Sequence, residues 1–186
     1  MELVYPVSIA PIAPGNRGSK EMLPVVDLSG SVIARASRAW CHGGSKLLHP
    51  VVHLHIIDRY GNVCLQLRSM IKHTYPLMWD TAVGGHVSYG EYLQEALFRE
   101  ASEELGLVDF NPIPLKEYVY ESPTRRELVC VYAAVGHFPL NPDREEVAEC
   151  RWWSVPEIED AYGKGILAPT FEEEFKSIKD SLLALL

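Results

Sequence analysis

The stretch GGHVSYGEYLQEALFREASEELGL, residues 84–107, decides how this sequence folds. Its apolar side chains recur at helical spacing over 92–105, and Gly106 then ends the pattern as a C-terminal cap. The spacing predicts one helix. The glycine-rich turn before that helix lets the backbone approach a ligand closely.

Three glutamates, Glu100, Glu103 and Glu104, share one face of this helix, because each residue advances about 100° around the axis. Carboxylates this close repel one another and resist ionisation unless a cation compensates them. Hard divalent ions prefer oxygen ligands, so Mg²⁺, or Mn²⁺ as second choice, is the expected cofactor. Arg99, four residues before Glu103, can hold carboxylates in place. A solvated acidic surface is the alternative interpretation.

The complete spacing of the stretch is more specific than the glutamates alone. It resembles the signature box of the Nudix hydrolases at every fixed position, and here it reads Gly85-x5-Glu91-x7-Arg99-Glu100-Ala101-x-Glu103-Glu104-x-Gly106-Leu107. Ala101 is smaller than the aliphatic residue that is common at its position. The resemblance implies an α/β fold, a Nudix-type α/β/α sandwich with a mixed β-sheet flanked by helices. It also implies hydrolysis of a pyrophosphate linkage in a nucleoside-diphosphate-type or other organic diphosphate.

The same resemblance implies roles for individual residues. The expected metal ligands are three carboxylates and one backbone carbonyl, from Glu100, Glu103, Glu104 and Gly84. The expected catalytic residues, which orient carboxylates or move protons, are Glu91, Arg99, Glu103 and Glu127.

In such enzymes a carboxylate near the metal takes the proton of the attacking water. This general base often lies outside the box, on a loop or strand near the metal. Glu127 is one candidate here, and the others are Glu145, Glu146 and Glu149. Substrate phosphates are expected at Arg125, Arg126 and His86, since guanidinium groups match phosphate oxygens.

A second resemblance covers residues 79–86, WDTAVGGH, which are similar to the corresponding stretch of type 1 isopentenyl-diphosphate isomerases, themselves of Nudix fold. Those enzymes have a catalytic Cys where this chain has Gly84, so the isomerase thiol is missing. Most of their metal ligands have counterparts in this chain, in His42, His49, His86 and Glu127, but Arg125 stands where those enzymes have a second acidic ligand. These histidines form either a second metal site or a protonated cluster that holds phosphate.

Three functions therefore stand at this point: a metal-dependent hydrolase, an isopentenyl-diphosphate-isomerase-like protein, and a non-catalytic diphosphate-binding module. The hydrolase is favoured because no box glutamate is lost and the isomerase thiol is absent. Sequence alone does not name the group attached to the diphosphate.

Composition limits the partners. The chain has 186 residues and a net charge of −8, which disfavours a nucleic-acid binder. It has no apolar run of about 18 residues, so no membrane span is expected. Four scattered cysteines favour free thiols and a cytoplasmic location. A homodimer through an edge strand is an open possibility.

The flanking segments complete the prediction. Residues 1–22, rich in Pro and Gly, are expected to be an extension, and 23–186 to be one Nudix hydrolase domain. Single strands are predicted over 79–83 and 151–153. Capping boxes at Ser154 and Thr170 are expected to begin two helices. His53 and His55 alternate on one strand face and are interpreted as packed, hydrogen-bonded residues. Of Trp152 and Trp153, which follow each other on another strand, only one can face the interior.

Overall fold

A computed structural model describes residues 21–186. Met22 already begins a strand, and the rest of the predicted extension, apart from Glu21, lies outside the described residues. The described strands are β1 (Met22–Val26), β2 (Val32–Ser37), β3 (Leu48–Ile57), β4 (Asn62–Arg68), β5 (Trp79–Thr81), β6 (Val83–His86), β7 (Ile113–Glu121), β8 (Arg126–Val135) and β9 (Val147–Ser154). The described helices are α1 (Arg38–His42), α2 (Leu93–Leu105), α3 (Val155–Ala161) and α4 (Pro169–Leu183).

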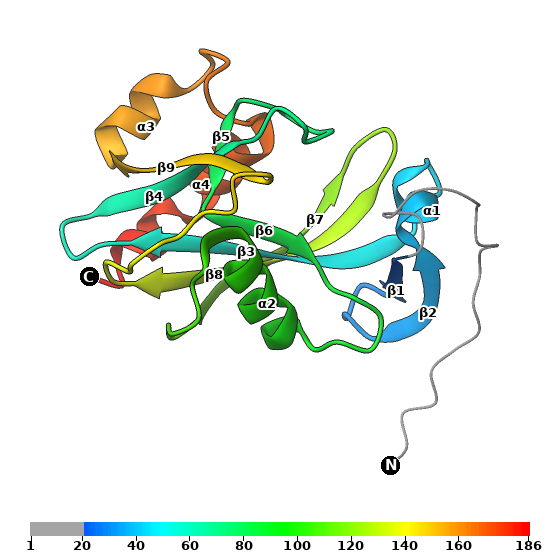
Figure 1. Cartoon of the computed structure of the whole chain (residues 1–186). Helices are drawn as coiled ribbons and strands as arrows, with labels where there is room; N and C mark the ends of the chain where they lie inside the picture. Colours follow the sequence, from blue (N-terminus) through cyan, green and yellow to red (C-terminus); the bar gives the residue numbers. More distant parts are fainter. Residues whose placement is uncertain (1–20) are drawn as a thin grey trace. The chain divides into compact units, whose positions relative to one another are not determined.

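The strands form two sheets (Figure 1). β1 pairs with β2, and the larger sheet has the order β5-β4-β3-β8-β7, with β6 beside β3 and β9 beside β4. The described chain divides into two compact units. The first unit comprises residues 21–52, Gly85–Ala96 and Glu117–Cys130, and the second comprises His53–Gly84, Leu97–Lys116 and Val131–Leu186.

The first unit contains an antiparallel hairpin of β1 and β2, followed at once by α1. The Ser37 hydroxyl accepts a hydrogen bond from the Trp40 amide and so caps this short helix. Small apolar side chains from the hairpin bury Cys41 of α1. This packing positions His42, the last residue of α1.

The second unit has helices on both faces of its sheet. Val63 and Leu65 of β4 lie in one apolar cluster with Phe171 and Phe175 of α4. Gln66, the next residue of β4, points to the other face and contacts α2. The predicted mixed sheet flanked by helices is therefore confirmed, and each large side chain buried in this core contributes about 1.5–3 kcal/mol.

Several features predicted from short sequence motifs agree with the structure. α2 ends where Gly106 adopts a left-handed φ of 64°, as the predicted cap requires. The Ser154 capping box is confirmed, because its hydroxyl accepts from the Glu157 amide and the Glu157 carboxylate accepts from the Ser154 amide. Of the two tryptophans, Trp153 faces the interior and Trp152 stacks on His137.

Other boundaries were predicted wrongly. The single strand over 79–83 is two strands, because the chain bends at Ala82 and changes its partner from β4 to β3. Thr170 does not cap α4, which begins at Pro169 after an Ala168 that makes no side-chain cap bond. β9 begins at Val147, four residues before the predicted strand, since its pairing with β4 extends to Arg68.

Two further predictions from composition concern membrane spans and the state of the cysteines. None of the helices in residues 21–186 is both long enough and apolar enough to cross a membrane. Cys41, Cys64, Cys130 and Cys150 are all free thiols, as the scattered spacing predicted.

Candidate functional site

Glu104 of α2 is a deeply buried carboxylate, with 2% of the residue exposed. One of its oxygens, Oε2, accepts hydrogen bonds from Gln66 Nε2 at 3.0 Å and from the Gly84 amide at 3.2 Å. The Lys72 ammonium lies 3.4 Å from the other oxygen. Burial raises the pKa of Glu104, and the nearby Lys72 opposes this shift without cancelling it.

Glu100 and Glu103 lie on the same helix and are bridged by one guanidinium. Arg99 donates from Nη1 to Glu100 at 2.8 Å and to Glu103 at 3.1 Å. Burial raises the pKa of Glu100 to about 7, and the charges of Glu104 and Glu103 add to this effect while Arg99 opposes it. Glu103 is largely exposed. The charges of the three carboxylates, here called the carboxylate cluster (Glu100, Glu103, Glu104), therefore interact, and they outnumber the neighbouring positive charges. In residues 21–186 their oxygens are not among the potential ligand atoms that lie within 4.8 Å of one another.

Lys72 connects this cluster to a loop that precedes β9. Its ammonium forms an ion pair with Glu146 as well as with Glu104. The same loop is fixed to the end of α2, because the Asp143 amide donates to the Glu104 carbonyl at 2.9 Å. Among the four base candidates, Glu146 is thus joined to the carboxylates through Lys72. Glu149 lines a separate cavity beside Cys150.

Glu91 lies in the turn before α2. Its carboxylate accepts from the Ser88 amide at 2.9 Å, and its own amide donates to the Ser88 carbonyl. These reciprocal bonds close the turn of residues 88–91 just before the helix begins at Leu93.

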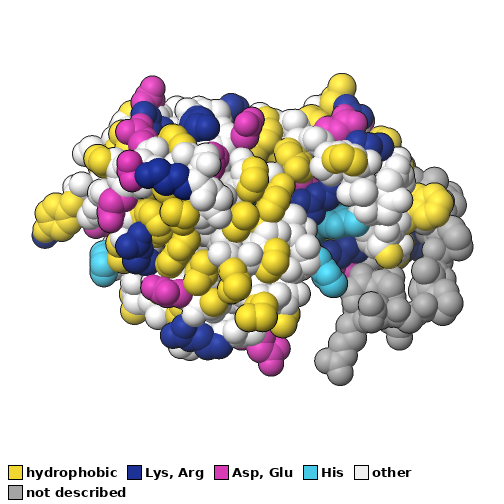
Figure 2. Space-filling model, turned by 90° about the horizontal axis from the view of Figure 1, so that it is seen from above, with side chains coloured by type: hydrophobic (Ala, Val, Ile, Leu, Met, Phe, Trp, Pro, Cys, Tyr) yellow, Lys and Arg dark blue, Asp and Glu magenta, His cyan; other side chains and the backbone are white. Residues whose placement is uncertain are grey.

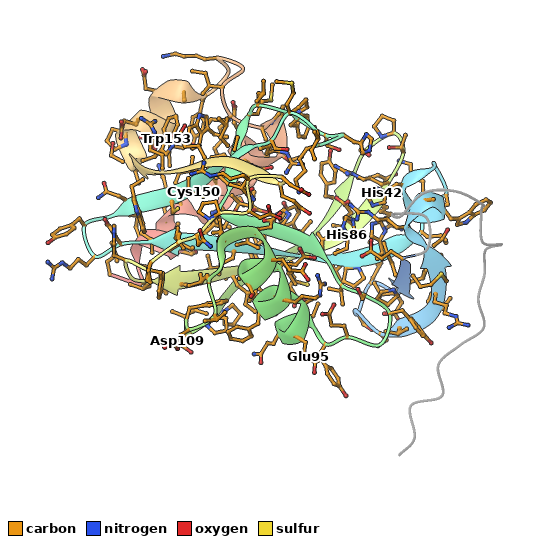
Figure 3. The ribbon with its side chains drawn as sticks, viewed as in Figure 1. His42, His86, Glu95, Asp109, Cys150 and Trp153 are labelled. Carbon is orange, nitrogen blue, oxygen red and sulfur yellow. The ribbon has the colours of Figure 1, made fainter. Side chains whose placement is uncertain are left out.

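The three predicted histidines converge in the first unit. The Nε2 atoms of His42 and His86 are 2.9 Å apart, and the ring centroids of His49 lie 5.3 and 5.7 Å from those two rings. Figure 3 shows His42 and His86 close together, and in Figure 2 a group of histidine side chains lies next to basic side chains.

Glu127 completes this group. One potential ligand atom from each of the four residues lies within 4.8 Å of the others. Two ligands on opposite sides of one ion are at most about 4.2 Å apart, so small side-chain movements would bring all four to a metal.

The protonation state of the three histidines favours metal ligation. The His49 Nδ1 lies 2.9 Å from the Leu47 carbonyl and donates to it, which leaves Nε2 buried without a hydrogen-bond partner, 3.8 Å from Glu127. Burial lowers the pKa of His42 to about 3, and it also lowers the pKa values of His49 and His86. The rings are therefore neutral at pH 7, which suits metal ligation and disfavours the protonated, phosphate-holding alternative.

Two of the three predicted phosphate contacts lie together. Arg125 Nε is 3.3 Å from Glu127, and its positive charge contributes to the lowered pKa of His86. Arg126 instead lies 3.8 Å from Glu121.

Sequence reasoning did not identify Gln66 and Lys72, which both contact Glu104. Gln66 carried a usable signal, since it is a polar residue in the otherwise apolar run of β4 and is almost fully buried. Lys72 follows β4 in an irregular segment, and nothing in the local pattern connects it with α2.

His53 and His55 form a separate network with a buried glutamate of α4. His53 Nδ1 lies 2.8 Å and His55 Nε2 lies 2.7 Å from the two carboxylate oxygens of Glu174. Burial alone would raise the pKa of Glu174, but the charge and hydrogen bonds of the histidines hold it well below its usual range. The packed, hydrogen-bonded interpretation of these histidines is confirmed.

Comparisons with known proteins identify the family and the fold of the chain. The sequence profile of the NUDIX domain matches residues 47–173. The isopentenyl-diphosphate Delta-isomerase of Brevibacterium linens is 34% identical over 147 residues, which cover 76% of this chain and 81% of that protein. The Nudix hydrolase YfcD of Escherichia coli is 31% identical over 140 residues, covering 75% of this chain and 77% of that protein.

Solved structures show the same fold. The crystal structure of DR0079 from Deinococcus radiodurans superposes with a TM-score of 0.73 at 22% identity, and covers 85% of this chain and 99% of that one. The NUDIX domain of Shewanella oneidensis NrtR, solved with ADP ribose, has a TM-score of 0.60 at 17% identity, over 72% of this chain and 87% of that one.

Proposed function

Because the chain belongs to the Nudix family, we propose that it is a metal-dependent hydrolase that cleaves a pyrophosphate linkage in an organic diphosphate. One observation carries the proposal. Glu104 is buried beside Glu100 on α2, and burial raises the pKa of both carboxyl groups.

The donor set fits a hard divalent cation such as Mg²⁺ or Mn²⁺. Every side-chain ligand atom offered by the cluster is a carboxylate oxygen, and Arg99 and Lys72 bring two positive charges to four carboxylates when Glu146 is included. When bound, such an ion neutralises phosphate oxygens and makes water a better nucleophile. Glu100, Glu103, Glu104 and the Gly84 carbonyl would hold it.

The protein side chains around this site orient its carboxylates. Arg99 fixes Glu100 relative to Glu103, while Gln66 and the Gly84 amide fix one oxygen of Glu104. We assign the proton of the attacking water to Glu146, which reaches the cluster through Lys72. Glu91 supports the start of α2 through its bonds to Ser88.

Glu127 was the first candidate for the base from sequence, and its contacts are with His49 and Arg125. The two assignments make different predictions. Glu146→Gln should lower the hydrolysis rate by about 10²-fold and remove the acidic limb of the pH–rate profile. Glu127→Gln should keep that limb. The reverse result would assign the base to Glu127.

A substrate panel tests the activity directly. Purified protein with Mg²⁺ or Mn²⁺ would be given ADP-ribose, nucleotide sugars, dinucleotides, nucleoside triphosphates and isoprenoid diphosphates, and phosphate-containing products would be measured. ADP-ribose heads the panel because the NrtR structure of the same fold contains it. Turnover of at least one compound that stops with EDTA is expected. No turnover of any compound, or full turnover in excess EDTA, would contradict the proposal.

An isoprenoid diphosphate isomerase is the second candidate, because His42, His49, His86 and Glu127 converge as the resemblance to those enzymes implies. Gly84 lacks the thiol of that reaction, and Cys41, next to His42, is fully buried with its pKa raised to about 11 by burial. We therefore expect no interconversion of isopentenyl and dimethylallyl diphosphates. Measurable interconversion that Cys41→Ser abolishes would establish this second function.

A further inference from the structure

Cys64 and Cys150 lie on neighbouring antiparallel strands of the second unit. In the pairing of β4 with β9, Gln66 is opposite Cys150 and Cys64 is opposite Trp152. Side chains two residues apart on a strand share a face, so the two thiols are diagonal neighbours on one side of the sheet. Figure 3 shows Cys150 on β9. The thiols are 86 positions apart in the sequence and only the register brings them together.

The two thiols interact with each other. Their side-chain hydrogen bond raises the pKa of Cys64 and lowers the pKa of Cys150. The positive charge of Arg144 also favours the Cys150 thiolate. Burial raises the pKa of all four thiols, to about 11 for Cys41 and about 12 for Cys130, and only in Cys150 do the other contacts lower it overall.

Cys150 is also within reach of small molecules. It is half-buried, and with Cys64 it lines a cavity of about 310 Å³ whose wall includes Arg144 and Trp152. Arg144 is held at this wall by a hydrogen bond of 2.6 Å to the Ala148 carbonyl. The cavity therefore combines an accessible sulfur, a fixed cation and a second, fully covered sulfur.

We propose that Cys64 and Cys150 are a peroxide-responsive dithiol that closes to a disulfide between β4 and β9. The Cys150 thiolate attacks one oxygen of a hydroperoxide, the O–O bond breaks, and Cys150 becomes a sulfenic acid while hydroxide or alkoxide leaves. The Cys64 sulfur then displaces the sulfenic hydroxyl, which leaves as water with the thiol proton. Two electrons pass from the two thiols to the peroxide. This modification does not depend on the proposed hydrolase activity.

The roles of the two thiols follow from their exposure. Cys150 is the attacking thiol because it is only half-buried, and Cys64 is the resolving thiol because just 1% of the residue is exposed. The disulfide would form beside Gln66, whose amide holds Glu104. A disulfide would therefore alter the pairing of β4 with β9 next to Gln66, the residue that holds Glu104 of the carboxylate cluster.

Peptide mass spectrometry tests the proposal on the full chain. Reduced protein would be treated with hydrogen peroxide, blocked with N-ethylmaleimide and digested without reductant. We expect a cross-linked peptide pair containing Cys64 and Cys150 that disappears with dithiothreitol. Before oxidation, iodoacetamide should modify Cys150 at least about tenfold faster than Cys41 or Cys130 at pH 7.

Single variants separate the two steps. Cys64→Ser should stop at a Cys150 sulfenic acid that dimedone traps, whereas Cys150→Ser should leave Cys64 as unreactive as Cys130. Cys130→Ser is the matched control and should form the same cross-link as the unaltered chain. A Cys150 that reacts no faster than Cys130, or a sulfenic acid that accumulates in the unaltered chain without a cross-link, would overturn the proposal.

Discussion

Glu104 on α2 and Glu174 on α4 are buried to almost the same extent, with 2% and 3% of each residue exposed. Their pKa values nevertheless shift in opposite directions, up for Glu104 and down for Glu174. Glu174 has a histidine on each carboxylate oxygen, at 2.8 and 2.7 Å. Glu104 has two neutral donors on one oxygen and a single ammonium 3.4 Å from the other.

The difference shows that the partners, more than burial, decide the charge state of a carboxylate. The Glu174 region supplies its own compensation and is a structural network. The Glu104 region has too few positive charges to compensate its carboxylates, which include Glu100 and Glu103 on the same helix. In the proposed function, a bound cation supplies the positive charge that the Glu104 region lacks.

The largest expected effect is on activity. Glu104→Gln should reduce hydrolysis by at least about 10²-fold, equivalent to about 2.7 kcal/mol of transition-state stabilisation, because an amide replaces a charged ligand. Initial rates with the best compound of the panel measure this. Glu95→Gln is the matched control, since Glu95 is an exposed glutamate on the same helix. Equal losses in both variants would mean that helix α2 is merely damaged.

The next effect is on stability. Glu174→Gln should lower the free energy of unfolding by about 2–4 kcal/mol, because two buried histidine contacts lose their charged partner. Hydrolysis should change little once the protein is folded. Urea unfolding gives the value, with the exposed Glu173→Gln as control on the same helix. An unchanged free energy of unfolding would show that the contacts of Glu174 with His53 and His55 do not stabilise the fold.

The stability effect of Glu174 has a definite pH dependence. Its pKa in the folded protein lies below the ordinary 4.5, so the unfolded chain binds the proton more readily. The stabilisation is complete above pH 4.5 and is lost as the pH falls towards the depressed pKa. The stability difference between the unaltered chain and Glu174→Gln should therefore be constant from pH 7 to about 5 and shrink below 4.5. A difference that grows on acidification would contradict the lowered pKa.

Metal binding should distinguish the Glu104 region from the Glu174 region without any substrate. Mg²⁺ at a hundred times its dissociation constant should stabilise the unaltered chain by about 2.7 kcal/mol, by mass action on the folded state. Glu104→Gln should lose most of this gain, whereas Glu174→Gln should keep it. Thermal unfolding with and without Mg²⁺ measures both. A gain of the same size in Glu104→Gln would place the metal elsewhere.

The smallest effect on turnover is expected from the histidine cluster. Replacing His42, His49 and His86 together by Ala should remove bound Zn²⁺ or Mn²⁺ in elemental analysis, because imidazole suits these ions better than Mg²⁺. Mg²⁺-dependent hydrolysis should fall by no more than about tenfold, since the carboxylates remain. A chain that keeps its full metal content after these changes has no metal site at the histidines.

Much of the fold was predictable because its signals are local. The α2 helix, its Gly106 cap and the Ser154 capping box each depend on residues within one or two turns of one another. The five-residue helix α1 was missed, since so short a segment shows no period and depends on the burial of Cys41.

The partners of the buried glutamates were not predictable, because they come from distant segments. Gln66 and Lys72 precede Glu104 by 38 and 32 residues, and His53 precedes Glu174 by 121. The position of Glu174 did carry a signal, because it lies in the apolar stripe of α4 beside Phe171 and Phe175. A charged residue in such a stripe predicts a buried partner without naming it.

Hydrolysis in ¹⁸O-labelled water, with the substrate that the panel identifies, tests the central claim most directly. The proposal predicts one ¹⁸O atom in a phosphate group of the product, formed only with Mg²⁺ or Mn²⁺ and reduced at least about 10²-fold in Glu104→Gln. Label in no phosphate group, or an unchanged rate of label incorporation in Glu104→Gln, would contradict cleavage at phosphorus by the carboxylate site.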